Sequence, residues 1–565
     1  MKSSIKKLAP KLPFIGNKLK YWIELEQRQI EYEVELEAKR IELEAKRIEL
    51  EAKRIELETN QLKFKALIEP FQNLQDCTPN IDRHPWDNPY LSVENISRFR
   101  EYSTDVWRFS LDYLEAHPEP LKCAFAVNMA QNTYKWARLA QKYGALVGLF
   151  PSPMDTSALN LPEWEEFDGE FSDLMDGESF LKTYPNIQVQ VPSFSVPMEG
   201  SELYSAFRDF CLGSRIPLLH LMSTSRSLRH EILFAYDGFY PYFSNAKALS
   251  NYEVIYAASN PLAAYASGKP YCTFSVGGDL QYDCGRTDDL GKLMSLSFNA
   301  ARFLMISNPH AIGHCRRLGL TNGIYLPYPM DDSIYSPGEG QARKIWEATY
   351  GEGVFVLATS RLDKKVKGQS DELFQALVDA AKTRPELRFI FLAWGNSLPE
   401  FQAKIASLDM GDRFILLPPV GKKRLIDYYR SCDIVLDQFV YGYYGATGLE
   451  AASVGKPILI KLRKEQYTPL YAGDVAPMIN VSEPHEIFEA LLRLVDSSEL
   501  RLQLGKDIRA WLVRNHGETK TMPLLLGLLR LAADNVSLPK DLVNPLFQDL
   551  SLQEESYYAA SRQTV

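Results

Sequence analysis

The sequence predicts an α/β protein with two doubly wound, Rossmann-like domains, which follow a long charged N-terminal helix. Two observations carry this prediction. Short apolar runs alternate with helical patterns over two stretches of the chain, which is typical of parallel sheets covered by helices. Between the two stretches, residues 327–337 hold three prolines and follow neither a helical nor a strand period, so they indicate a linker between domains.

The length of 565 residues exceeds what one ordinary core accommodates, so several domains are expected. The predicted parts are a basic tail (1–20), a helical repeat (21–70), a first Rossmann-like, acceptor-side domain (71–330), a second, donor-side domain (331–520), and a C-terminal helix that returns to the first domain, with a tail (521–565). A net charge of -9 argues against a general nucleic-acid binder, which needs a basic face. The seven scattered cysteines and the lack of a membrane-spanning apolar run favour a cytoplasmic location.

The N-terminal segment has two parts. Residues 1–20 hold six lysines and no acidic residue, mixed with apolar side chains. Residues 1–22 therefore fit either peripheral docking on an anionic membrane surface or a disordered, solubilising tail. The motif EAKRIEL then occurs three times over residues 37–57, in a composition that favours helix. Its isoleucines and alanines form a weak seam, which predicts a helical spacer or a modest coiled coil open to self-association.

Six strands are expected in the first stretch, over residues 123–127, 146–150, 253–257, 271–276, 303–307 and 324–326. The loop over residues 128–132 follows the first of them, at the edge where such sheets bind ligands. The acidic residues 162–178 interrupt the alternation, and we expect them to form a solvated loop. His310 and His314 have the helical spacing of a metal pair, but they lack an acidic partner between them and are interpreted as surface histidines.

The second stretch predicts strands over residues 354–359, 387–393, 413–417, 433–439 and 457–462. Its central feature is residues 433–460, which are expected to form a strand, a glycine-rich loop, a short helix that carries Glu450, and another strand. Glycines between a strand and a helix let backbone amides approach a ligand, and the helix N-terminus favours an anion. This turn therefore suits a phosphate, with Glu450 near the sugar that the phosphate carries.

Two cations support a phosphate site at the same edge. Arg361 and Lys367 follow the first strand of the second stretch, so they project from a loop at a carboxyl strand end. Arginine offers a planar fork to phosphate oxygens and lysine a point charge. A solvated basic loop is the alternative, because Lys364 and Lys365 lie in the same segment. The coincidence with the glycine-rich turn favours a pyrophosphate site.

Residues from about 120 to 515 resemble a GT-B glycosyltransferase of the family 4 (glycosyl transferases group 1) type, most strongly in the C-terminal half. The resemblance is carried by Ser360-Arg361-Leu362-Asp363 with Lys367-Gly368, and by Glu450 to Pro457, which match the second half of the family's Glu-x7-Glu signature. It implies that Arg361, Lys367 and Asp279 act at the reacting centre. It also implies that the donor is bound by Gly445, Ala446, Thr447, Gly448, Glu450, Gly395, Asn396 and Val420.

The chain departs from this family pattern at two positions. Gly442 stands where the first glutamate of the signature contacts the donor sugar, and Val276 stands where many relatives have the histidine of a His-Gly-x-Asp loop, which reads Val276-Gly277-Gly278-Asp279 here. The resemblance implies transfer of a sugar from a nucleoside diphosphate sugar to a glycan or other hydroxyl acceptor, with retention of configuration. We expect no metal and no cofactor besides the donor substrate. A non-catalytic nucleotide-sugar or glycan-binding scaffold and a sugar-nucleotide epimerase are the alternatives.

Overall fold

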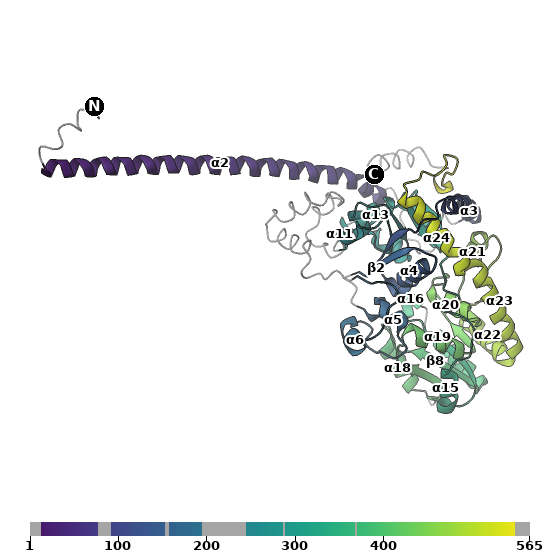
Figure 1. Ribbon diagram of the computed structural model, residues 1–565. Helices are drawn as coiled ribbons and strands as arrows, with labels where there is room; N and C mark the ends of the chain where they lie inside the picture. Colours follow the sequence, from purple (N-terminus) through teal and green to yellow (C-terminus); the bar gives the residue numbers. More distant parts are fainter. Residues whose placement is uncertain are drawn as a thin grey trace. The chain divides into compact units, whose positions relative to one another are not determined.

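Two parallel, six-stranded sheets with surrounding helices confirm the predicted fold class (Figure 1). The computed structural model describes residues 13–76, 92–152, 157–194, 245–285, 289–367, 370–408 and 410–548. The predicted basic tail over residues 1–20 and the C-terminal tail lie largely outside these residues. The chain divides into two compact units, Met1–Ala66 and Leu67–Val565, and both sheets belong to the second.

The first sheet has the strand order β2-β1-β3-β4-β5-β6, and all its pairs are parallel. Its strands are β1 (Lys122–Ala126), β2 (Leu146–Phe150), β3 (Val254–Ala258), β4 (Tyr271–Phe274), β5 (Phe303–Ile306) and β6 (Gly323–Tyr325). β1 pairs with β2 on one side and β3 on the other, so the strand order reverses there. Ligands of open parallel sheets bind at such a reversal, outside the carboxyl ends of the strands.

The second sheet has the order β12-β11-β10-β7-β8-β9. Its strands are β7 (Val354–Ala358), β8 (Leu387–Leu392), β9 (Phe414–Leu417), β10 (Ile434–Leu436), β11 (Ile458–Ile460) and β12 (Ile479–Asn480). Counted from β7 as the first strand, this is the Rossmann order 3-2-1-4-5-6 read from the opposite edge. The reversal falls between β7 and β10, which are the strands that precede the predicted pyrophosphate loops.

Helices alternate with these strands as the periodicity predicts. Around the first sheet they are α3 (Val93–Ala116), η2 (Met129–Gln131), α4 (Asn132–Lys142), α11 (Ala246–Leu249), α12 (Leu262–Ala266), the π-helical η4 (Asp279–Asp283), α13 (Asp289–Asn299), α14 (Pro309–Arg317) and η5 (Pro545–Phe547). Around the second they are α15 (Ala342–Tyr350), α16 (Lys364–Lys367), α17 (Asp371–Thr383), α18 (Leu398–Ala406), α19 (Lys422–Ser431), α20 (Ala446–Val454), α21 (Lys464–Leu470), α22 (Pro484–Asp496) and α23 (Ser498–His516). α24 (Glu518–Ala533) packs on β3, β4 and α3 of the first domain.

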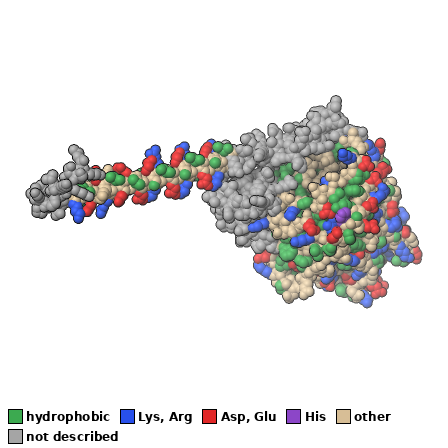
Figure 2. Space-filling model, turned by 45° about the horizontal axis from the view of Figure 1, so that its top comes forward, with side chains coloured by type: hydrophobic (Ala, Val, Ile, Leu, Met, Phe, Trp, Pro, Cys, Tyr) green, Lys and Arg blue, Asp and Glu red, His purple; other side chains and the backbone are tan. Residues whose placement is uncertain are grey.

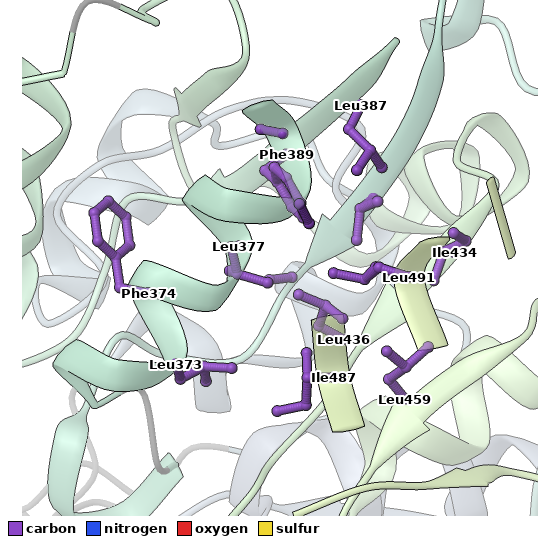
Figure 3. Packing of buried hydrophobic residues seen from close by; sticks show 14 of the residues in the cluster. Leu373, Phe374, Leu377, Leu387, Phe389, Ile434, Leu436, Leu459, Ile487 and Leu491 are labelled. Atoms are coloured by element: carbon purple, nitrogen blue, oxygen red, sulfur yellow. The ribbon is translucent and has the colours of Figure 1, made fainter. Parts of the chain in front are cut away.

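The core of the second domain lies between its sheet and the helices α17 and α22 (Figure 3). Leu377 of α17 and Leu491 of α22 contribute buried side chains to the same cluster as Phe389 of β8 and Leu436 of β10. Apolar residues recur at helical spacing on α17 and α22, so each helix buries one face. Burial of this surface fixes the carboxyl ends of β7, β8 and β10 relative to one another.

The acidic residues 162–178 do not form a solvated loop, and the expectation was wrong. They contain α5 (Pro162–Glu166) and lead into α6 (Gly177–Thr183). The side chains of Trp164, Phe167 and Phe180 are buried in one cluster. The density of carboxylates suggested solvation, but aromatic residues between them supply enough apolar surface for a small core of their own.

The helix α2 (Pro13–Asp76) contains the EAKRIEL repeats. Its 64 residues span about 96 Å at the rise of an α-helix. Acidic and basic side chains alternate along it (Figure 2), and Lys46 and Glu42 form one of several ion pairs, at 2.7 Å. Ile41 and Ile48 are more than 60% exposed. Among the described residues, no helix combines the length and apolar composition that crossing a membrane requires.

Candidate active site

The loops that follow β7 and β10 bring the predicted cations and the glycine-rich turn to one edge of the second sheet. β7 and β10 are neighbours, so both loops leave the carboxyl edge side by side. The Arg361 side chain is 44% exposed there, and Lys367 is half-buried. Gly445 is the exposed N-cap of α20 and has no side chain that caps the first amides of the helix. The end of α20 can therefore receive an anion beside two cations.

The remaining predicted residues of the glycine-rich turn divide by exposure. Ala446 and Thr447 are half-buried and begin α20, whereas Gly448 is buried beneath them. A Cβ at Gly448 would lie 2.9 Å from Oδ2 of Asp437, so the backbone of the helix passes directly over that carboxylate. Asp437 also accepts a hydrogen bond from the Ser360 hydroxyl at 3.2 Å. This buried aspartate, which the sequence analysis did not single out, joins the β7 and β10 loops.

Gly395 and Asn396 follow β8 and lie beside the loop that carries Arg361. The Leu362 amide donates to the Trp394 carbonyl at 2.8 Å, and the Ser397 amide donates to the Leu362 carbonyl at 3.0 Å. Gly395 lies between these two bonds with a φ of +113°, and the side chain of Asn396 is exposed. A Cβ at Gly395 would lie 2.5 Å from the Leu362 carbonyl oxygen. Only glycine fits this close contact between the two backbones.

Replacing Gly395 with alanine is expected to lower the free energy of unfolding by about 1–3 kcal/mol, because the methyl group meets rigid backbone and the φ is strained. Urea unfolding measures this loss. Gly411→Ala is the matched control, since nothing lies within 4 Å of a Cβ at Gly411. Equal urea midpoints of unfolding for Gly395→Ala and Gly411→Ala would contradict the close contact.

Glu450 lies one turn into α20, but its carboxylate is 1% exposed and already saturated with donors. Lys135 Nζ of α4 lies 3.2 Å from Oε1. Lys422 Nζ of α19 donates to Oε1 at 2.7 Å and to Oε2 at 3.0 Å. The Tyr429 hydroxyl lies 3.5 Å from Oε2. Ribose hydroxyls can hydrogen-bond this carboxylate only if at least one of these groups moves.

The charges of this cluster determine which of its side chains are ionised. Burial alone would raise the pKa of Glu450, but Lys422 and Lys135 outweigh it and hold that pKa below its usual value. Burial would likewise lower the pKa of Lys135, yet Tyr328, Glu450 and Glu165 hold it above the usual range. The Lys135–Glu450 pair is therefore ionised at neutral pH and joins the two domains.

The segment over residues 162–178 covers the predicted base pocket around Val420. Glu170 and Val420 form an antiparallel bridge. The Phe171 amide donates to the Pro419 carbonyl at 3.0 Å, and the Gly421 amide donates to the Gly169 carbonyl at the same distance. Val420 is 3% exposed. The segment therefore forms a wall over this loop of the second domain, and we call residues 162–178 the strap.

Asp279 begins η4 and is 2% exposed. Its carboxylate accepts hydrogen bonds from the Ser275 hydroxyl at 2.6 Å and from the amides of Val276, Gly277 and Leu280 at 2.8–3.1 Å. The carboxylate thus holds its own loop together. Burial outweighs these bonds and raises its pKa to about 6.

A raised pKa in the folded state gives stability a definite pH dependence. Between pH 3.8, the ordinary pKa of an aspartate, and pH 6, the approximate pKa of Asp279 in the folded protein, the folded protein retains a proton on Asp279 that the unfolded chain has released. Stability is therefore expected to fall as the pH rises through this window, by up to about 3 kcal/mol relative to Asp279→Asn. Unfolding both proteins in urea from pH 4 to pH 7 measures the difference. The pKa shift would be contradicted if the stability of the wild type, relative to that of Asp279→Asn, stayed constant or rose with pH.

His310 and His314 lie on α14, and the interpretation as surface histidines was wrong, because both are at least 92% buried. Burial lowers the pKa of His310 to about 4, so the ring is neutral at physiological pH. Its ring packs against that of Tyr443 of the glycine-rich loop in a tilted arrangement, with centroids 4.6 Å apart. A Cβ at Gly277 would lie 3.0 Å from its Nε2. An imidazole therefore stands between the two loops, although Val276 replaces the family's histidine in sequence.

Sequence reasoning missed Lys135, Lys422, Asp437 and His310. Lys135 had one signal, because it and Arg138 stand three residues apart among the large apolar residues of the predicted helix. Lys422 and Asp437 carry no pattern in the sequence that separates them from ordinary polar residues, and His310 stood out only by its helical spacing to His314. Among the described residues, no three side chains of the kinds that ligate metals gather at one place.

Comparison with known proteins relates part of the chain to glycosyltransferases. No family model matches it. It is 25% identical over 214 residues to D-inositol 3-phosphate glycosyltransferase of Acidothermus cellulolyticus. The matched residues make up 36% of this chain and 47% of that protein. It is 27% identical over 146 residues to mannosylfructose-phosphate synthase of Agrobacterium fabrum. Here the matched residues make up 24% of this chain and 32% of that protein. The chain thus spans less than half the length of these curated relatives.

The chain also aligns with solved structures. Anabaena HepE in complex with UDP aligns with a TM-score of 0.47 and 14% identity, over 73% of this chain and 100% of that chain.

Proposed function

We propose that this chain, a relative of GT-B glycosyltransferases of the family 4 type, transfers a sugar from a nucleoside diphosphate sugar to a hydroxyl acceptor with retention of configuration. The observation that carries the proposal is the edge where Arg361, Lys367 and the start of α20 meet. Two cations and the first amides of α20, which no side chain caps at the N-terminus of the helix, stabilise the negative charge that grows on a departing diphosphate. The curated relatives, which are named as glycosyltransferases and a sugar-phosphate synthase, support the same class.

In this mechanism the chain acts by position and charge. Arg361 binds two oxygens of the diphosphate with its planar fork, and Lys367 neutralises a third. The amides of Ala446 and Thr447, at the positive end of α20, complete the anion site. Asp279 remains a candidate for the contact with the reacting sugar, in which case its loop must open toward the cleft. The acceptor hydroxyl then replaces the diphosphate on the sugar carbon, and binding both substrates in one cleft removes much of the entropic barrier.

Glu450 favours a second candidate, a non-catalytic scaffold that binds nucleotide sugars or glycans. Its carboxylate is held by Lys135 and Lys422, and it contributes to the cohesion of the domains. A protein that uses this carboxylate mainly as an interdomain contact can bind a ligand without converting it. This candidate is also consistent with Gly442 and Val276 at the two positions that depart from the family pattern.

Two measurements separate the candidates. Calorimetry with UDP, GDP, ADP and CMP identifies the nucleotide that binds, and labelled donors of that nucleotide are then incubated with the protein. Transfer, or slow hydrolysis of the donor, supports the transferase. Binding without turnover supports the scaffold, and conversion of the sugar on the donor supports an epimerase. Failure of all four nucleotides to bind would refute a donor site.

We further propose that the N-terminal segment provides contacts outside the catalytic cleft. Residues 1–22 would dock on an anionic membrane surface, which sedimentation with vesicles tests.

The exposed seam that contains Ile41, Ile48 and Ile55 would pair with a second copy of the chain. Sedimentation velocity over a range of concentrations tests this pairing. A cytoplasmic location, as expected from the cysteine pattern, stays a prediction.

A further inference from the structure

The polypeptide passes between the two domains twice, and hydrogen bonds hold the two crossings together. The first crossing follows β6, and the second lies between α23 and α24. The Met330 amide donates to the His516 carbonyl at 2.9 Å, and Met330 and Gly517 form a parallel bridge. The His516 ring is fully buried, and its Nδ1 lies 2.9 Å from the Tyr328 carbonyl oxygen. His516 therefore contacts the first crossing through its backbone and through its ring.

The other nitrogen of the His516 ring connects the crossings to the glycine-rich loop. Its Nε2 lies 2.7 Å from the Tyr471 hydroxyl, and that hydroxyl contacts the hydroxyl of Tyr444. Burial lowers the pKa of His516 to about 3, so the ring is neutral at pH 7. Since the Tyr328 carbonyl can only accept, Nδ1 carries the proton and Nε2 accepts from Tyr471, whose oxygen accepts from Tyr444. We call this run of hydrogen bonds, from Tyr328 to Tyr444, the relay.

Tyr444 stands directly before the N-cap of α20, which is Gly445. Its ring stacks on Tyr467 with centroids 4.7 Å apart, and its amide donates to the Tyr467 hydroxyl at 3.3 Å. That hydroxyl donates to Asn308 Oδ1 at 2.8 Å, and Asn308 Nδ2 lies 3.5 Å from the Tyr444 carbonyl oxygen. Asn308 follows β5 of the first domain, so groups from both domains hold Tyr444.

The proposed diphosphate site needs this part of the loop to be held in place. The amides of Ala446 and Thr447 stabilise an anion only while they point at it, and any freedom of the loop is lost at a cost when the ligand binds. Glycines at positions 442, 445 and 448 make the backbone of the loop intrinsically flexible. The tyrosine rings and the relay supply the restraint that these glycines cannot.

We propose that Tyr471 and His516 are positioning residues, which act through Tyr444 to hold the diphosphate-binding end of α20 in the arrangement that the domain crossings set. Their role rests on the proposed donor site, to which they add residues that lie outside the ligand contacts. A change in the arrangement of the domains moves the crossings and breaks the relay. The loop then regains its freedom, and the donor binds less tightly.

The test removes single links of the relay in the full-length protein. Tyr444→Phe and Tyr471→Phe keep the aromatic rings and lose one hydroxyl each. His516→Asn keeps a donor for the Tyr328 carbonyl and loses the acceptor for Tyr471. Each variant, and the double variant Tyr444→Phe/Tyr471→Phe, is titrated by calorimetry with the nucleotide that binds the wild type among UDP, GDP, ADP and CMP. Urea unfolding of the same proteins measures their stability.

Tyr271→Phe is the matched control. The Tyr271 hydroxyl is buried in the first domain and donates to the Ser297 carbonyl, so this variant also loses one buried hydrogen bond of a tyrosine. It should lose stability as the relay variants do, and its affinity for the nucleotide should stay within twofold of the wild type. The affinity is measured where every protein is folded, so a loss of stability alone does not change it.

We expect each relay variant to bind the nucleotide about 3- to 10-fold more weakly, the range that one lost hydrogen bond spans. The double variant should bind within twofold of Tyr471→Phe, because breaking one link already releases the loop.

Two results would overturn the relay while the donor site stands. One is a wild-type affinity in Tyr471→Phe and His516→Asn together with a loss of stability like that of Tyr271→Phe, which would make the aromatic cluster purely structural. The other is a double variant whose loss equals the sum of the two single losses in free energy, which would make the contacts independent. If no nucleotide binds the wild type, the proposed donor site fails first, and the positioning role fails with it.

Discussion

Replacing Glu450 with glutamine is expected to lower the free energy of unfolding by about 3–5 kcal/mol, the largest stability effect predicted for this chain. The carboxylate is 1% exposed and compensates the buried ammonium group of Lys135 and that of Lys422. Glutamine removes the carboxylate that both cations contact, in a region from which water is excluded, and Glu165, whose effect on Lys135 is smaller than that of Glu450, remains near them. Urea unfolding at pH 7 measures the loss.

Glu178→Gln is the control for this experiment. Glu178 pairs with Lys182 at 2.6 Å, but both side chains are more than 70% exposed, so the variant should stay within about 0.5 kcal/mol of the wild type. Lys135→Met adds an internal check, because the double variant Lys135→Met/Glu450→Gln should be less destabilised than the sum of its parts. Glu450→Gln and Glu178→Gln with the same stability would contradict the buried ion pair.

The pH dependence of this contribution has a definite sign. The pKa of Glu450 is held below its usual value in the folded state. Its stabilisation is therefore fully present at neutral pH, above the unfolded pKa, and is lost as the pH falls through the folded pKa. The two effects have opposite signs: stability is lost with rising pH through Asp279, up to about pH 6, and with falling pH through Glu450, below its ordinary pKa of 4.5. Each variant isolates one of them.

Replacing Arg361 with alanine is expected to lower the rate of sugar transfer by about 10²–10³, the second large effect. The Arg361 side chain is 44% exposed and lies beside the start of α20, so its removal takes a donor from the diphosphate site without emptying the core. Turnover with a saturating labelled donor measures the loss. Calorimetry with the nucleotide should show weaker binding in the same variant.

Arg384→Ala is the matched control for Arg361→Ala. Arg384 pairs with Asp496 at 2.7 Å and precedes β8, at the opposite end of the sheet from the donor loops. This variant should lose little stability and retain its rate. If Arg361→Ala retained both rate and nucleotide affinity while folded, the donor site would have to lie elsewhere.

The ion cluster around Glu450 also limits how a donor can enter. If Glu450 binds ribose, Lys135 or Lys422 must release one of its oxygens, and the contact between the domains weakens as the nucleotide arrives. Donor binding and interdomain cohesion would then compete for one carboxylate. Comparing donor affinity in Lys135→Met with that in the wild type measures this competition directly.

The sequence alone determined the architecture and one half of the site. Strand and helix periods are local, because each buried strand needs a continuous apolar run and each covering helix an apolar face. Eleven of the twelve described strands, the glycine-rich turn and the cations Arg361 and Lys367 all follow from such short-range patterns. β12 and α15 were not predicted, since two strand residues and a helix with only Ala342 and Trp346 buried leave too weak a pattern.

Only the tertiary structure decided what the polar residues do. Lys135 and Glu450 are 315 residues apart, and the pair forms because two separate sheets bring their helix ends together. The strap reaches Val420, His310 reaches Gly277, and neither contact follows from local sequence. The stem of Arg463 fills the space left by a missing side chain at Gly442 for the same reason. Backbone periodicity is encoded over a few residues, whereas the charge of a site depends on residues that folding brings together from distant positions.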